Sequence, residues 1–149
     1  MPDVAAAPGA SWLIVGGCLS AVAALLHVGC IAGGPDWYRF FGAGEGMARA
    51  AARGDWRPTL ITLVITAVLL VWAAYAFAGA GWLPRPPLLR TGLVAITTVY
   101  LLRGLLFVPL NLWRPQYDSG FAIWSSLIVL VFGAVHAVGT IRAWPHLAP

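Results

Sequence analysis

Four long apolar stretches constrain the fold of this chain more than any other feature. A hydrocarbon core about 30 Å thick is crossed by about 20 helical residues, and each stretch is long enough to cross it. Backbone groups left unpaired in lipid cost several kcal/mol each, so a crossing segment must be helical. The sequence therefore predicts an all-α membrane protein: one domain, residues 1–149, forming a four-helix transmembrane bundle over residues 11–32, 59–78, 91–110 and 121–141.

Composition and charge agree with surroundings of membrane lipid. Hydrophobic residues make up 60% of the chain and charged residues only 9%, whereas a soluble domain is about a quarter charged. The pI of about 9.7 could indicate a nucleic-acid partner. The arginines flank the apolar stretches, however, where positive charge borders a membrane span. We therefore expect no nucleic-acid partner.

Tryptophan and arginine positions bear on the ends and the orientation of these spans. Trp12, Trp56, Trp82, Trp113, Trp124 and Trp144 lie near expected helix ends, where an indole prefers the headgroup layer, and Trp72 lies well inside a span. Arginine counts favour a cytoplasmic side for the first and third connections. Because acidic residues of the first connection can pair with its arginines, the sequence leaves the orientation open.

The first connection, residues 33–58, is too apolar to be a solvated linker. Its aromatic residues are Trp37, Tyr38, Phe40 and Phe41. Farther along, Glu45, Arg49 and Arg53 recur at i, i+4 and i+8 and share one helical face. We expect a short helix lying at the membrane interface, preceded by an aromatic segment that dips into the headgroups.

A candidate site follows from depths along the helices. Arg103 is costly in lipid, at least about 2.5 kcal/mol, and is expected to face a partner or a cavity unless it snorkels to the headgroups. Tyr100 lies on the same stripe, and His27 is on the side where the first connection begins. We expect His27, Tyr100, Arg103 and Glu45 to converge beneath that connection, and His136, near the opposite side, to stay apart.

Plainer roles compete at each of these positions. His27 on a packed helix can be a hydrogen-bonded structural residue, and Glu45 can simply pair with Arg49 in the favourable i,i+4 order. The small and hydroxyl residues on the four stretches can serve close packing and interhelical hydrogen bonds.

The histidines and cysteines do not predict a cofactor or a metal site. His27 and His136 differ in depth by roughly 16 Å, too far to ligate one haem iron. Cys18 and Cys30 are separated by roughly 18 Å of helical rise, beyond disulfide reach, and neither a CxxC nor an HxxxH motif is present.

The segment from Gly33 through Pro58, with its aromatic run, its Gly42-Ala43-Gly44-Glu45-Gly46 stretch and its arginines, resembles the signature segment of small bacterial four-helix inner-membrane proteins of uncharacterised type. That resemblance covers about a third of the chain. It implies a multi-pass protein of the cell inner membrane and no particular activity.

Three functions remain open, and binding is favoured over catalysis. A binding protein would hold a small amphiphile or lipid headgroup between the first and third spans, with these residues around it: Trp37, Tyr38, Arg39, Phe41, Arg49, Tyr100 and Arg103. An enzyme on a lipid-soluble substrate would use His27 or Glu45 as acid or base and Arg103 as electrostatic stabiliser. A structural subunit would bind copies of itself or other membrane proteins through its polar stripes.

Overall fold

The fold is entirely helical in the part of the chain that the structure describes. This computed structural model describes residues 8–114 and 119–148, which form five α-helices and one short 3₁₀ helix. In order these are α1 (Ala10–Phe40), α2 (Glu45–Ala52), α3 (Arg57–Gly79), α4 (Leu89–Trp113), α5 (Ser119–Ala143) and η2 (Trp144–Leu147). The predicted helical class and the short helix beginning at Glu45 are confirmed.

Four of the helices are long and apolar enough to cross a membrane: α1, α3, α4, and α5 together with η2. The shortest, α3, has 23 residues and is about 34 Å long, more than the roughly 30 Å of a hydrocarbon core. Only 22–28% of each helix's most apolar window is buried inside the molecule. The outward surface of all four helices is therefore mainly apolar.

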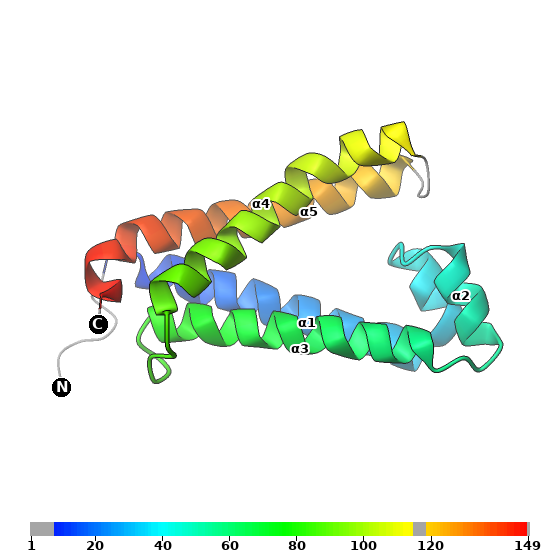
Figure 1. Ribbon diagram of the computed structural model, residues 1–149, viewed down its shortest axis with the longest axis horizontal. Coiled ribbons are helices and arrows are strands. Elements are labelled where there is room, and N and C mark those ends of the chain that lie inside the picture. The colour runs from blue at the N-terminus through cyan, green and yellow to red at the C-terminus, as the bar shows by residue number, and fades with distance from the viewer. Residues whose placement is uncertain (1–7, 115–118, 149) are drawn as a thin grey trace.

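The long helices form two antiparallel pairs, α1 with α3 and α4 with α5. The pairs lie together at the end that carries the start of α1, the α3–α4 turn and η2, which we call the closed end (Figure 1). They diverge toward the end that carries α2, which we call the open end. Helix α1 also packs against α5, and this contact joins the two pairs.

Small residues permit the close approach of α1 and α5. Leu13 of α1 packs against Gly139 of α5. A β-carbon on Gly139 would lie only 2.9 Å from the Leu13 side chain, so a larger residue would not fit there. Leu13 belongs to the buried cluster at the closed end, which comprises Ala10, Leu13, Ala78, Ala80, Leu89, Leu93, Ala143 and Leu147. A second buried cluster lies farther along the pairs and comprises Ala24, Leu69, Ile96 and Tyr100.

Helix α1 continues to Phe40, past the predicted end at residue 32, but it is not one straight helix. Gly34 has φ 68° and ψ −150°, a backbone conformation that glycine adopts readily because it has no β-carbon. This conformation interrupts the helical geometry. Pro35 follows and starts the last helical turns, because a proline at the first position of a helix loses no hydrogen bond there. The aromatic segment expected in the first connection is thus helical.

Helix α2 folds back on the last turns of α1. Its Ala48 is fully buried in a third cluster with Cys30 and Tyr38 of α1. The hydroxyls of Tyr38 and Thr62 of α3 lie 3.2 Å apart, within hydrogen-bond distance. The end of α1, α2 and the start of α3 therefore form one packed unit at the open end.

Arg85 of the α3–α4 turn and Arg90 at the start of α4 fix the C-terminal segment at the closed end. Arg85 donates to the carbonyl oxygens of His146 and Ala148 at 2.7 and 2.6 Å. Arg90 donates to the carbonyl of Trp144 at 2.8 Å and also lies over its ring. These guanidinium groups satisfy carbonyls that the end of a helix leaves without intrahelical partners.

Candidate functional site

A cluster of polar and aromatic side chains lies where the two pairs pack together. All four long helices contribute residues to it. The hydroxyls of Ser20 on α1 and Tyr100 on α4 are 2.8 Å apart and hydrogen-bonded. The Tyr100 ring makes edge contacts with Trp72 of α3 at 4.9 Å and Phe132 of α5 at 5.6 Å. It also lies 5.1 Å from the ring of His136 on α5. We call these five residues the central cluster.

His136 is completely buried in this cluster. Its Nδ1 lies 2.9 Å from the Phe132 carbonyl oxygen, which can only accept, so Nδ1 carries the proton and donates. Nε2 is then an acceptor, and it has no hydrogen-bond partner among the described residues. Gly16 of α1 faces the ring: a β-carbon there would lie 2.9–3.1 Å from three imidazole atoms.

The contact between Tyr100 and His136 corrects the expectation that His136 stays apart from the candidate residues. That expectation compared depths along the helix axes. Side chains lean toward the N-terminus of their own helix, and α4 and α5 are antiparallel. Tyr100 therefore leans toward the closed end while His136 leans toward the open end, and the two rings meet.

His27 lies well away from this cluster along α1. It is seven residues beyond Ser20, the cluster's residue on this helix, which is about 10 Å of helical rise. Its Nδ1 is 2.7 Å from the carbonyl of Ala23 one turn earlier, and the side chain is half-buried. Within the described residues, no group of three His, Cys, Asp or Glu side chains could hold a metal ion.

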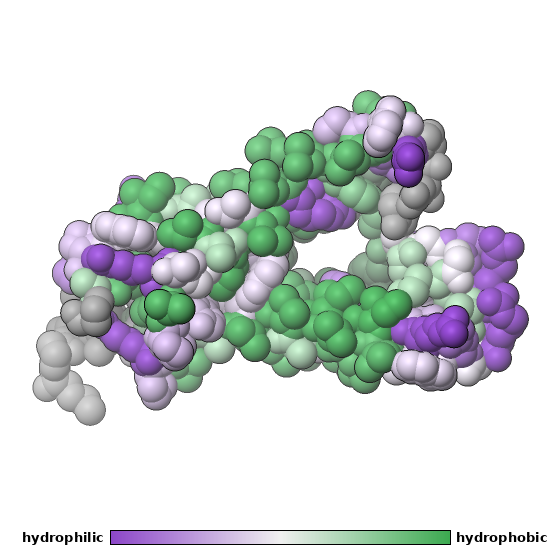
Figure 2. All heavy atoms as spheres, viewed as in Figure 1, coloured by the Kyte–Doolittle hydropathy of each residue, from purple (hydrophilic) through white to green (hydrophobic). Residues whose placement is uncertain are grey.

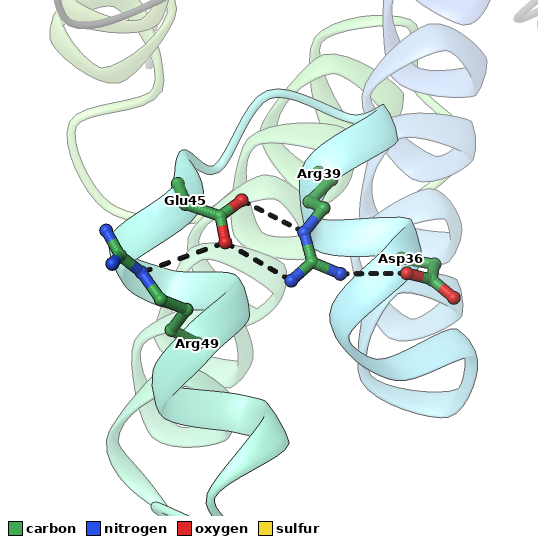
Figure 3. Close-up of polar contacts among 4 residues, drawn as sticks. All are labelled: Asp36, Arg39, Glu45 and Arg49. Carbon is green, nitrogen blue, oxygen red and sulfur yellow. Dashed lines mark hydrogen bonds and ion pairs between the residues drawn. The ribbon is translucent and has the colours of Figure 1, made fainter.

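Glu45 belongs to an exposed ion network that ties α2 to the end of α1 (Figure 3). Arg39 donates to both carboxylate oxygens of Glu45, at 2.9 and 3.2 Å, and to Asp36 at 2.8 Å. Arg49 lies 3.7 Å from the same carboxylate, as its i,i+4 spacing predicts. The hydrogen bond from Arg39, together with the charges of both arginines, lowers the pKa of Glu45.

The aromatic candidates of the first connection take two different positions. Tyr38 is buried against α2 and α3. The Trp37 ring folds back over Gly29 and Gly33 of its own helix. A β-carbon on Gly33 would overlap the indole, and a β-carbon on Gly29 would lie 2.9 Å from Cζ3 of Trp37. The Trp37 ring contacts Phe41 at 5.7 Å and remains 44% exposed.

Arg103 lies on the α4–α5 pair toward the open end. Its guanidinium carbon is 3.7 Å from the centroid of the Phe107 ring, and its Nη2 is 3.5 Å from Ser125 Oγ on α5. Phe107 in turn meets Phe121 edge to face at 6.4 Å. Arg103, Phe107 and Phe121 thus form a continuous strip along the α4–α5 pair.

Phe121 also reaches across to the other pair. A β-carbon on Gly42, in the connection between α1 and α2, would lie 2.0–2.4 Å from three atoms of the Phe121 ring. Gly42 has φ 71°, so both its backbone and this close approach require glycine. The contact shows that the Arg103 strip lies on the side of α4 and α5 that faces the first connection.

The structure divides the predicted site into three groups. Tyr100 joins Ser20 and His136, Glu45 joins Arg39 and Arg49, and Arg103 joins Phe107 and Ser125. In the part of the chain that the structure describes, His27 is placed in none of these groups. No sequence pattern indicated that Gly42 and Phe121 lie against each other. Trp72, by contrast, stood out as the one tryptophan deep inside a span.

No protein-family model, curated protein or solved structure matches this chain. Its function is therefore argued from the geometry of its own residues.

Proposed function

We propose that this chain is a multi-pass protein of the cell inner membrane and binds a small amphiphile or lipid headgroup between α1 and α4. The membrane placement is supported by four long apolar helices with mainly apolar outward surfaces. Large side chains such as Leu25, Val64, Leu105 and Val131 are 55–68% exposed, and lipid is the solvent in which such a surface is stable.

The observation that carries the binding proposal is the opening between the two helix pairs. Figure 2 shows this opening beside α1 and α3 on one side and α4 and α5 on the other, with mainly apolar residues along it. The buried cluster that contains Ala24 and Tyr100 joins the pairs. The next buried cluster toward α2, among the described residues, lies within the end of α1 and the segment that follows it. That cluster contains no residue of α4 or α5, so it does not join the two pairs.

Arg103 gives this opening a preference for an anionic headgroup. It lies on the strip of the α4–α5 pair that faces the first connection. A guanidinium at this depth is costly unless it meets a polar partner, and it binds carboxylate and phosphate oxygens through planar hydrogen bonds. An anionic headgroup beside Arg103 with an apolar chain along the opening would match both parts of the surface.

The aromatic residues of the first connection would border the same occupant. Trp37 and Phe41 contact one another on the α1 side, and an indole is stable at the level of lipid headgroups. Arg39 and Arg49 pair with Glu45 at the exposed end of this region, whereas Arg103 lies on the strip that faces the opening. We therefore expect headgroup binding to depend chiefly on Arg103.

Native mass spectrometry of the detergent-purified protein tests this function. Phosphatidylglycerol is the probe, phosphatidylcholine is the uncharged comparison, and Arg103→Gln is compared with Arg142→Gln, whose exposed arginine lies at the closed end near Trp12. We expect wild type and Arg142→Gln to retain phosphatidylglycerol. Arg103→Gln should lose affinity about tenfold, or 1.4 kcal/mol.

Two outcomes would overturn the proposal. One is retention of neither lipid by the wild-type protein, and the other is equal retention by both arginine variants. Thermal unfolding of Arg103→Leu separates the roles of this residue. Unchanged or increased stability indicates a ligand-binding arginine, and a clear decrease indicates one that holds α4 and α5 together.

A further inference from the structure

We infer that the occupant of this opening enters sideways from the bilayer and that Phe121 blocks entry from the aqueous end. Entry from lipid presupposes the amphiphile site proposed above. Sideways entry requires a ligand that is lipid-soluble as a whole molecule. It also gives Phe121 the role of a barrier at the aqueous end.

Phe121 stands at the aqueous end of the opening. Phe121 is half-buried and extends from the beginning of α5 toward the connection between α1 and α2. Its ring leaves no room for even a methyl group at Gly42. Because α5 belongs to one helix pair and Gly42 follows the other, this contact bridges the two pairs beyond Arg103.

The opening also faces the side of the long helices. Figure 2 looks across the long helices, and the opening is visible in this direction. Helices that cross a bilayer have their sides in the membrane plane, so this direction faces acyl chains. The Gly42–Phe121 contact stands at the end of the helices instead, on the side of the charged network of Asp36, Arg39, Glu45 and Arg49.

A lipid and a water-soluble anion would reach Arg103 by different routes. A lipid moving sideways keeps its chain in hydrocarbon and carries only its headgroup toward Arg103. A water-soluble phosphate would have to pass the Phe121 ring, which also contacts the Phe107 ring edge to face. The same anionic group would therefore be accepted when attached to a lipid chain and excluded when free in water.

Photo-crosslinking in nanodiscs tests this assignment. The probe is phosphatidylglycerol with a diazirine on one acyl chain, diluted in phosphatidylcholine, and the competitor is water-soluble glycerol 1-phosphate. In wild type we expect adducts on α1 beyond Ala24 and on α4 beyond Tyr100, unchanged by the competitor. In Phe121→Ala, we expect the competitor to reduce those adducts about tenfold, equivalent to 1.4 kcal/mol.

Phe40→Ala is the matched control, because Phe40 is a 78% exposed aromatic residue of the same end region. It should behave as wild type. Phe121→Leu serves if Phe121→Ala does not fold, as judged by a single symmetric peak in size-exclusion chromatography.

The outcomes separate the two proposals. If phosphatidylglycerol labels neither segment in any variant, the amphiphile site itself is wrong. If labelling occurs but glycerol 1-phosphate reduces it in wild type, the site stands and sideways entry is overturned. If the competitor has no effect in the folded Phe121 variants, Phe121 is not the barrier.

Discussion

A β-carbon on Gly16 would lie 2.9 Å from Cε1 of His136, so the fully buried imidazole rests directly on the backbone of α1. This contact is part of the α1–α5 packing that joins the two helix pairs. Because the imidazole is held by the Phe132 carbonyl as well, it has little freedom to move aside.

Gly16→Ala is therefore expected to destabilise the fold. Overpacking of a filled core costs about 1–3 kcal/mol, and thermal unfolding in detergent measures the effect. Gly46→Ala is the control, because no heavy atom lies within 4 Å of a β-carbon there. Alanine at this exposed position of α2 should be neutral or stabilise by about 0.5–1 kcal/mol. Equal effects of the two substitutions would contradict the packing role of Gly16.

The hydrogen bond between Ser20 and Tyr100 is expected to contribute modestly to stability. Tyr100→Phe removes one hydroxyl and leaves the ring contacts with Trp72 and Phe132 in place. Interhelical hydrogen bonds of this kind average about 0.6 kcal/mol in membrane proteins. A double-mutant cycle with Ser20→Ala measures the coupling, and a coupling of zero would show that the two hydroxyls do not stabilise one another.

The ion network at α2 is expected to weaken in acid. The pKa of Glu45 is lowered in the folded protein, chiefly by its hydrogen bond with Arg39. Its contribution is therefore present above the ordinary glutamate pKa of about 4.3 and is lost as the pH falls through the lowered folded value. Carboxylate NMR of Glu45 measures this pKa directly.

The same network can be tested with substitutions. Arg39→Gln should return the Glu45 pKa toward its ordinary value, whereas Arg53→Gln, at the exposed end of α2, should leave it in place. High salt should reduce the shift because all of these groups are solvent-exposed. An unchanged Glu45 pKa in Arg39→Gln would contradict the assigned cause.

Arg85 is expected to hold the C-terminal segment against the α3–α4 turn. Arg85→Gln removes the donors to the carbonyls of His146 and Ala148, so hydrogen exchange in residues 144–148 should become faster. Arg142→Gln, which leaves these carbonyls untouched, is the control. Unchanged exchange in Arg85→Gln would show that the contacts of Arg90 with Trp144 and the packing of Leu147 fix this segment without Arg85.

Local sequence was sufficient for the four long apolar helices and the short helix at Glu45, but it missed the helical turns that end at Phe40. It also failed where contacts between distant elements decide the arrangement. Glu45 and Arg49 were expected to pair from their i,i+4 spacing, and they do. Arg39 was not recognised as the main partner of Glu45, because their closeness depends on α2 folding back on α1. Likewise, Tyr100 was placed with Arg103 from helical spacing, although its ring contacts belong to Trp72, Phe132 and His136.

The sequence by itself determined that the chain is helical and where its long apolar helices lie, because the length and polarity of a segment are local properties. The break at Gly34 and Pro35 follows from backbone preferences in the same way. Only the tertiary structure decided that the helices form two diverging pairs, that His136 rests on Gly16, and that Phe121 meets Gly42. Those contacts join residues about 80 to 120 positions apart, and dispersion between packed groups depends on their final separation and not on their order in the chain.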